Sequence, residues 1–247
     1  MSLYYQDDCV TLYHGDSFEY MAHMADASVK AVLTDPPYDQ RTHSMARSNS
    51  TQNGLSGKAS RVLSGGSDKR FDAFDHPVQL QAFAEMGRIT QGWVVSTLSM
   101  DTAFRFQVEA APKGLRLLRV GAWVKTNPMP SISADRPGQG WEPIAYMFRD
   151  DTKPTWNGGG KHGNYVLPTA QGQGHPTSKP LSMVSDWVQK FTDHGDTVLD
   201  PFAGSGTTLR AAVDNGRKAV GIELNEAYCE LIAKRLSQGA LDLFGVA

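Results

Sequence analysis

The strongest constraint on the fold is an alternation of short apolar runs and amphipathic stretches along almost the whole chain. Amphipathic stretches such as Leu181–Thr192 and Thr207–Asp214 predict helices. The apolar runs predict seven β-strands, over residues 10–14, 29–34, 93–97, 117–124, 144–148, 197–199 and 219–222. Strands that alternate with helices are typical of a mostly parallel sheet, so we expect a single α/β domain over residues 1–247.

Polar residues ahead of several amphipathic stretches predict where helices begin. The expected N-caps are Ser17 for a helix over 18–24, Asp75 for a helix with Pro77 in its first turn, Asp101 for 102–110, and Asn225 for 226–237, which would end before Gly239.

Residues 39–75 do not fit this alternation. The segment is rich in Ser, Gly, Asn and Thr and carries several cations, among them Arg41, Arg47, Lys58 and Arg61. A loop this long in a compact domain is either functional or disordered, so we expect a basic, flexible loop here.

The charge of the chain is unevenly distributed. The formal net charge is −2, but residues 41–180 carry 17 Lys and Arg against 10 acids, a balance of +7. The two ends together carry −9. This asymmetry fits a protein with one basic surface for phosphates, and ordinary solvated surface charge explains it equally well.

Composition also excludes some classes of protein. No run approaches the roughly 18 apolar residues of a membrane span, so we expect a soluble, cytoplasmic protein. The two cysteines, Cys9 and Cys229, form no disulfide framework or C-x-x-C motif. The seven histidines are scattered, so we expect no bound metal.

A short acidic motif, Thr34-Asp35-Pro36-Pro37-Tyr38, follows the second apolar run. Ligands of α/β sheets bind at the carboxyl ends of strands, where this motif falls. Asp35 offers a carboxylate acceptor, the prolines fix the backbone and leave the Pro36 carbonyl as a second acceptor, and Tyr38 offers a flat ring. These groups suit the exocyclic amino group of a planar base. A plain Asp-Pro turn accounts for the motif alone equally well.

The chemistry of such an amine explains the two acceptors. The amine of adenine or cytosine is a weak nucleophile, because its lone pair is delocalised into the ring. If Asp35 and the Pro36 carbonyl each accept one N–H, the nitrogen becomes more tetrahedral and its lone pair can be aimed at an electrophile. Tyr38 would stack on the base, a contact worth about 1–3 kcal/mol.

A second motif, Val198–Thr208, predicts a strand, a glycine-rich turn and a helix. Gly204 and Gly206 would let the backbone approach a ligand closely. The spacing is neither that of a nucleoside-triphosphate loop nor a complete dinucleotide fingerprint. Asp200, at the strand end, would hold a cation such as an amino-acid ammonium. Glu223 ends the next apolar run and would bind both ribose hydroxyls of a nucleoside, the alternative being an exposed strand-end carboxylate.

With both motifs, the chain resembles the amino-group DNA methyltransferases that use S-adenosylmethionine, and among them the circularly permuted beta class, in which the catalytic motif precedes the cofactor loop. The resemblance spans nearly the whole chain and implies a Rossmann-like class I methyltransferase fold, with a seven-stranded, mostly parallel sheet between two helical layers and no metal. Five segments carry it in the order of the family: His14–Asp16, Asp35–Tyr38, Trp123–Asn127, His175–Pro180 and Asp200–Thr208.

The same resemblance implies roles for individual residues. Asp35, Pro36, Pro37 and Tyr38 would be catalytic, with Asp35 also bordering the cofactor. Glu223 would take the ribose and Asp16 the adenine side, the alternative for Asp16 being a helix cap. Lys179 would approach from the preceding loop, where a solvated lysine is the alternative. The methionine part of the cofactor would be held by Asp200, Phe202, Gly204, Ser205, Gly206 and Thr207.

DNA is the partner that the resemblance implies, with the target base flipped out of the duplex. Residues 127–175 would form a reduced target-recognition region with one core strand, and the loop over 39–75 would share in reading the bases. A homodimer stays open. The cations expected at the DNA are Arg41, Arg47, Lys58, Arg61, Lys125 and Arg136.

Asp at the first motif position favours adenine N6 as the target, because relatives of cytosine N4 specificity more often carry Ser there. Cytosine N4 is the first alternative, and a non-catalytic DNA-binding or decoy protein is the second. A glutamine or RNA methyltransferase would typically carry Asn at this position and place the cofactor loop first. A nicotinamide oxidoreductase would need the fuller glycine fingerprint.

Overall fold

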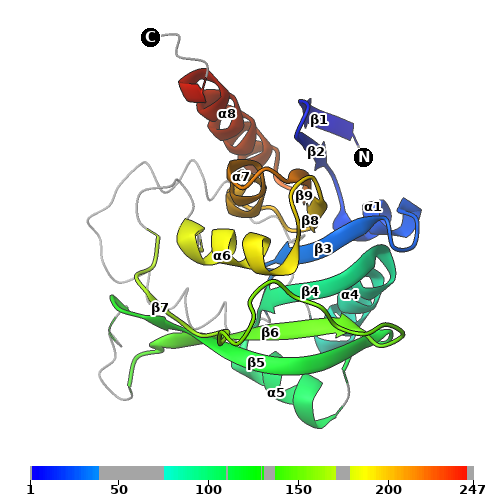
Figure 1. Cartoon of the computed structure of the whole chain (residues 1–247), viewed down its shortest axis with the longest axis vertical. Coiled ribbons are helices and arrows are strands. Elements are labelled where there is room, and N and C mark those ends of the chain that lie inside the picture. The colour runs from blue at the N-terminus through cyan, green and yellow to red at the C-terminus, as the bar shows by residue number, and fades with distance from the viewer. Residues whose placement is uncertain are drawn as a thin grey trace.

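The computed structural model describes residues 2–38, 75–109, 111–128, 130, 137–170 and 179–243. Within these residues, nine strands form one sheet in the order β1-β2-β9-β8-β3-β4-β6-β5-β7 (Figure 1). The strands are β1 Ser2–Gln6, β2 Val10–His14, β3 Val29–Thr34, β4 Thr90–Thr97, β5 Leu115–Lys125, β6 Trp141–Arg149, β7 Tyr165–Leu167, β8 Thr197–Asp200 and β9 Lys218–Glu223.

The centre of the sheet is parallel. β2, β9, β8, β3 and β4 pair in parallel register, whereas β6 runs antiparallel to both β4 and β5. The carboxyl ends of the central strands therefore meet at one edge of the sheet, the place where α/β folds bind their ligands. This arrangement confirms the Rossmann-like α/β fold with a mostly parallel sheet.

All seven predicted strands are present, and two more extend the sheet at its edges. β1 pairs antiparallel with β2, and β7 pairs parallel with β5. β7 lies within 127–175 as a three-residue strand at the edge of the sheet, so that region holds it in addition to the expected core strand, β6. Neither added strand has a long run of buried apolar residues: β1 is exposed at both its ends, and β7 has only three residues.

Helices cover both faces of the sheet (Figure 1). One layer, formed by α6, α7 and α8, packs on the apolar cluster around Trp187 and Phe191; the other, formed by α1, α4 and α5, packs on the cluster around Phe83 and Phe106. The helices are α1 Ser17–His23, α4 His76–Ile89, α5 Met100–Val108, α6 Leu181–Phe191, α7 Thr207–Asp214 and α8 Glu226–Leu243.

The caps agree with the predictions at two helices and differ at two. Asp75 caps α4, and Asn225 accepts a hydrogen bond from the backbone N–H of Ala227 in α8. Asp16, rather than Ser17, caps α1, and Ser99, rather than Asp101, caps α5. In both helices the residue just before the first turn has an extended backbone, and its polar side chain accepts hydrogen bonds from free N–H groups of that turn.

α8 continues through Gly239 to Leu243, so its predicted end was wrong. A glycine can be accommodated inside a helix at a cost of about 1 kcal/mol relative to alanine, and here it does not end the helix. None of the helices in the described ranges is long and apolar enough to cross a membrane.

Candidate active site

The two predicted motifs meet at the carboxyl edge of the sheet, because β3 and β8 are neighbouring parallel strands. β3 leads directly into Asp35, and β8 ends at Asp200. The hydroxyl of Thr34 donates a hydrogen bond to Oδ1 of Asp200 at 2.7 Å and joins the two strand ends. Segments far apart in the sequence thus form one site.

Asp35 lies at the centre of a network of donors. Oδ1 accepts hydrogen bonds from the Thr97 hydroxyl and, at 3.1 Å, from the Tyr38 hydroxyl. Oδ2 accepts one from the Lys179 ammonium at 2.5 Å. A carboxylate has about four acceptor positions, so these three donors leave one, on Oδ2. The side chain of Asp35 is 30% exposed, which leaves that position within reach of a ligand.

A second carboxylate, Glu142 of β6, faces the same lysine. Its Oε2 lies 3.3 Å from Nζ of Lys179, and its Oε1 lies 2.6 Å from Nζ of Lys125. Lys179 is buried, and the side chains of Lys125 and Glu142 are each 17% exposed. The aromatic ring of Trp123 lies beside both ammonium groups. The cluster therefore alternates positive and negative charges in the order Lys125, Glu142, Lys179, Asp35.

The cluster shifts the titration of its members. Burial alone would lower the pKa of Lys179, but Asp35 and Glu142 outweigh it and raise that pKa above the ordinary value. Burial alone would raise the pKa of Glu142, but the two lysines outweigh it and lower that pKa. Burial, with the two nearby carboxylates, raises the pKa of Tyr38 well above its usual range. Lys179 therefore stays protonated and cannot accept a proton at neutral pH.

The glycine-rich turn joins β8 to α7. Gly204 and Gly206 both have positive φ, 53° and 76°, which is the left-handed region that favours glycine. Among the described residues, a Cβ at Gly204 would find one atom within 4 Å, the Phe202 carbonyl oxygen at 3.9 Å. The turn is thus open at Gly204. A Cβ at Gly206 would lie 2.9 Å from Ile232 of α8, so this glycine is required for packing.

Glu223 fixes the open turn to the next strand. Its Oε2 accepts a hydrogen bond from the backbone N–H of Gly204, and its Oε1 accepts one from that of Asn225, both at 2.8 Å. Burial raises the pKa of Glu223 to about 7 and that of Asp200 to about 6. Two buried carboxylates without a cation between them are costly, and they gain from a ligand that brings positive charge or hydroxyl donors.

Several residues that were predicted to contact the cofactor or DNA also make contacts within the protein. Oδ1 of Asp16 accepts hydrogen bonds from the backbone N–H groups of Phe18 and Glu19, so Asp16 has the capping role that was its alternative reading. Lys179 contacts Asp35 and Glu142, and Lys125 contacts Glu142. A cofactor contact of Lys179 and a DNA contact of Lys125 stay predictions. Arg41, Arg47, Lys58, Arg61 and Arg136 lie outside the described residues.

Sequence reasoning missed two members of the cluster, Thr97 and Glu142. Thr97 ends β4 next to the end of β3, a position that only the strand order reveals. Glu142 did leave a signal, because it is an acidic residue at the start of the otherwise apolar run of β6. A charge in a buried strand requires a partner, and that partner could have been sought among nearby lysines.

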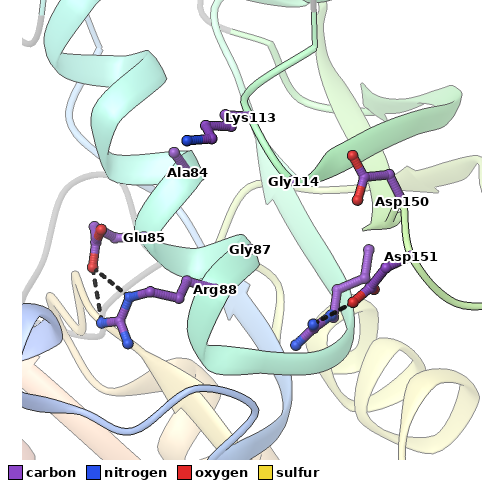
Figure 2. Close-up of a pocket in the computed structure, with 9 residues that line it drawn as sticks. Ala84, Glu85, Gly87, Arg88, Lys113, Gly114, Asp150 and Asp151 are labelled. Carbon is purple, nitrogen blue, oxygen red and sulfur yellow. Dashed lines mark hydrogen bonds and ion pairs between the residues drawn. The ribbon is translucent and has the colours of Figure 1, made fainter.

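Another depression lies away from this edge (Figure 2). It is lined by α4 and by the ends of β5 and β6, including Arg88 and Arg149. Arg88 pairs with Glu85 (Figure 2), and Arg149 pairs with Asp151. Arg149 also bonds the carbonyl of Thr90, at the amino end of β4, so this depression lies at the opposite edge of the sheet from Asp35. Both arginines already have carboxylate partners, and the depression lies away from the two motifs, so it is no rival for the active site.

Among the residues that the structure describes, no group of three or more His, Cys, Asp or Glu side chains could hold a metal ion.

The fold and the meeting of the two motifs define a DNA methyltransferase of the class I type. The family model described as DNA methylase matches residues 29–235, and the chain therefore belongs to the N6/N4 DNA methyltransferase family. This family uses S-adenosylmethionine and acts on exocyclic amino groups of DNA bases.

Relatives of known name agree with this placement. The chain is 26% identical over 257 residues to the Type II methyltransferase M2.LlaDCHI of Lactococcus lactis subsp. cremoris, covering 96% of this chain and 93% of the relative. The solved structure of the M1.HpyAVI complex with SAM has a TM-score of 0.64 at 25% identity and covers 92% of this chain and 99% of that one. The cytosine-N4-specific PvuII DNA methyltransferase has a TM-score of 0.69 at 17% identity, with 94% and 88% covered, and shares the fold.

The residues at the carboxyl edge fit the cofactor of the family. The open turn at Gly204 leaves room for a ligand against the backbone. The buried carboxylates of Asp200 and Glu223 are acceptors for an ammonium group and for ribose hydroxyls, the polar groups of S-adenosylmethionine. The side chains that line this site are acidic, as a positively charged ligand requires. A site for a nucleotide phosphate would instead be lined by basic side chains and backbone N–H groups.

Proposed function

We propose that this protein transfers a methyl group from S-adenosylmethionine to N6 of adenine in DNA. The observation that carries the proposal is the place of Asp35: a carboxylate with one open acceptor, next to the glycine-rich turn. In the family that the chain resembles, Asp at this position goes mostly with adenine and Ser with cytosine.

The substrate is proposed to be duplex DNA in which a specific sequence is modified. Type II relatives such as M2.LlaDCHI support this part of the proposal by their names. A base inside a duplex cannot reach Asp35, so the target must be flipped out, at a cost of a few kcal/mol. The cationic segments predicted from the sequence would hold the backbone phosphates and make the affinity sensitive to salt.

In this proposal, the chain's own residues supply position rather than strong base chemistry. Asp35 and the Pro36 carbonyl each accept one N–H of the target amine, and the Tyr38 ring supports the base. S-adenosylmethionine supplies a methyl group on a positively charged sulfur: the new N–C bond forms as the C–S bond breaks, with its electron pair returning to sulfur. Asp200 and Glu223 would hold the ammonium and the ribose.

The methylated nitrogen then carries one proton too many. Lys179 is already protonated, so it cannot accept this proton. Asp35 is the nearby carboxylate with an open acceptor position, and its partial exposure lets it pass the proton on to water. No strongly basic group is needed, because the cationic amine is itself acidic.

Transfer of label from S-adenosylmethionine to unmethylated DNA tests the proposal, with digestion of the product to nucleosides. We expect the label in N6-methyladenine. Label only in N4-methylcytosine would mean that cytosine, and not adenine, is the target, while the class of reaction stays the same. Label in neither nucleoside, from protein that binds both S-adenosylmethionine and DNA, would favour the non-catalytic binding protein.

The raised pKa values predict how cofactor affinity varies with pH. Glu223 has a pKa of about 7 without cofactor, and ribose hydroxyls need its ionised form as acceptor. Binding therefore releases a proton at low pH, and affinity rises with pH. From the ionised fractions, Glu223 by itself should make the affinity at pH 6 about eightfold lower than at pH 7.5, and Asp200, with its pKa of about 6, should add about a further twofold. Calorimetry in buffers of different ionisation enthalpy measures both the affinity and the proton release.

The matched variant for this prediction is Glu223→Gln. It should bind S-adenosylmethionine weakly with a flatter dependence on pH over the same range, since only the contribution of Asp200, with its pKa of about 6, remains. An unchanged pH dependence in Glu223→Gln would remove Glu223 from the ribose site.

A further inference from the structure

Glu142 shares two hydrogen-bond donors with Asp35. Nζ of Lys179 lies 2.5 Å from Oδ2 of Asp35 and 3.3 Å from Oε2 of Glu142. The hydroxyl of Tyr38 lies 3.1 Å from Oδ1 of Asp35 and 3.2 Å from the same Oε2 of Glu142. Both donors thus lie between the two carboxylates.

The Tyr38 hydroxyl has a single proton, so it can donate to only one carboxylate at a time. The two distances are nearly equal, and neither acceptor is favoured by geometry. When Tyr38 donates to Glu142, Oδ1 of Asp35 loses that donor and gains an open acceptor position. Glu142 is therefore an alternative acceptor that can relieve Asp35 of one of its bonds.

Lys179 differs from Tyr38, since an ammonium has three protons and can donate to both carboxylates together. Glu142 attracts this ammonium as well as Asp35 does, and Lys125 pairs with Glu142 at 2.6 Å. The backbone fixes the arrangement as well, because Glu142 stands opposite Trp123 in the antiparallel β5–β6 pair. The position of Lys179 thus depends on Glu142 as well as on Asp35.

We propose that Glu142 is a positioning residue for methyl transfer: by sharing the Lys179 ammonium and the Tyr38 hydroxyl with Asp35, it keeps acceptor positions of Asp35 open for the amino group of the target base. The inference rests on the proposed function. It adds a residue of β6 that touches neither the base nor the cofactor and that acts through Lys179 and Tyr38.

Glu142→Gln is the variant that tests this role. The amide keeps the shape of the side chain and one oxygen acceptor but loses the negative charge, so Lys179 turns fully to Asp35 and occupies its open position. We expect kcat to fall about 10- to 100-fold, since misplaced reacting groups typically cost this much. The dissociation constants of S-adenosylmethionine and of DNA should stay within about twofold, because the loss is in the reacting geometry.

The pH profile separates positioning from simple structural support. The groups that face Lys179 are Asp35 and Tyr38 after β3, Glu142 on β6 and the Lys125 ammonium on β5 across Glu142. Without the Glu142 charge, the pKa of Lys179 falls, because one of its two carboxylates is gone. At high pH Lys179 loses its proton, and kcat/KM should fall with it. This fall should therefore begin at lower pH in Glu142→Gln than in the wild type.

Glu85→Gln is the matched control, since Glu85 is a partly exposed carboxylate that is ion-paired with Arg88 on the same helix, α4. It should leave kcat and the pH profile unchanged. If the wild type is active and Glu142→Gln has the same kcat and pH profile, the role of Glu142 is overturned and the proposed function stands. An equal loss of kcat in Glu142→Gln and Glu85→Gln would also overturn this role, because it would point to general destabilisation of the protein. A wild type that methylates neither adenine nor cytosine would overturn the proposed function and this inference with it.

Discussion

The Asp35→Ala variant is expected to lose methyl transfer by about 10³-fold or more. The variant removes the carboxylate that would accept an N–H of the target amine, and nothing else in the described network replaces it. Lys179 has no acceptor lone pair, and the hydroxyls of Thr97 and Tyr38 are neutral oxygens that do not supply the negative charge of the carboxylate. Single-turnover transfer of label to DNA, with enzyme in excess, measures the loss without interference from product release.

Asp35→Asn is needed beside Asp35→Ala, because an alanine leaves Lys179 with fewer partners and could weaken the fold. The amide keeps the volume of the carboxylate, and we expect a similar loss of transfer. Cofactor affinity should change far less, by about threefold or less, because Asp200 and Glu223 are expected to hold S-adenosylmethionine. Transfer at the wild-type rate by either variant would show that Asp35 is not the amine acceptor.

Lys179→Met is expected to lower the free energy of unfolding by about 3–5 kcal/mol, the usual cost of removing one partner from a buried ion pair. The Lys179 side chain is 9% exposed and faces two carboxylates. Without the ammonium, Asp35 and Glu142 face each other with only Lys125 and hydroxyl groups as partners. Methyl transfer should fall by about 100-fold or more, because Asp35 loses its fixed orientation. Urea unfolding of both proteins measures the stability.

The loss of stability should depend on pH with a definite sign. The lysines lower the pKa of Glu142 below its ordinary value of 4.5, so their pairing stabilises the fold fully above about pH 4.5. That contribution disappears as the pH falls through the lowered pKa. The difference in free energy of unfolding between the wild type and Lys179→Met should therefore be largest at neutral pH and should become smaller below pH 4.5. A gap that stays constant with pH would contradict the ion-pair explanation.

Lys190→Met is the matched control for the buried lysine. Lys190 is also buried, with a side chain 10% exposed, but pairs with one carboxylate, that of Asp186 in the same helix, which is 33% exposed. After its removal, Asp186 can be solvated, so we expect a loss of only about 1 kcal/mol. Methyl transfer should be retained. Equal destabilisation by both substitutions would mean that the charges of the Asp35 cluster contribute nothing special.

The sequence predicted the centre of the fold well and its edges poorly. β2 and β3 have the predicted bounds, because each is an apolar run between turn residues. β1 is a largely exposed edge strand that is held by its pairing with β2, and its sequence shows no alternation of buried and exposed residues. Asp35 and Asp200 were found because each follows an apolar run directly.

The contacts around Asp35 could not be predicted in the same way. The contact of Lys179 with Asp35 depends on where the residue just before Pro180, the N-cap of α6, lies relative to the end of β3, and no local pattern records that place. Glu142 reaches the cluster because β6 runs antiparallel between β4 and β5. The strand order, which no local pattern records, decides which side chains meet.

The position of β8 in the middle of the sheet has a consequence for biosynthesis. This strand fills the place between β3 and β9, yet it starts only at Thr197 of 247 residues. While the ribosome is still translating the earlier codons, the apolar edge of β3 has no neighbour on that side. Unpaired edges of this kind promote aggregation of nascent chains. Fragments that stop before Thr197 should accumulate in inclusion bodies, and chaperones that shield nascent chains should raise the yield of the full-length protein.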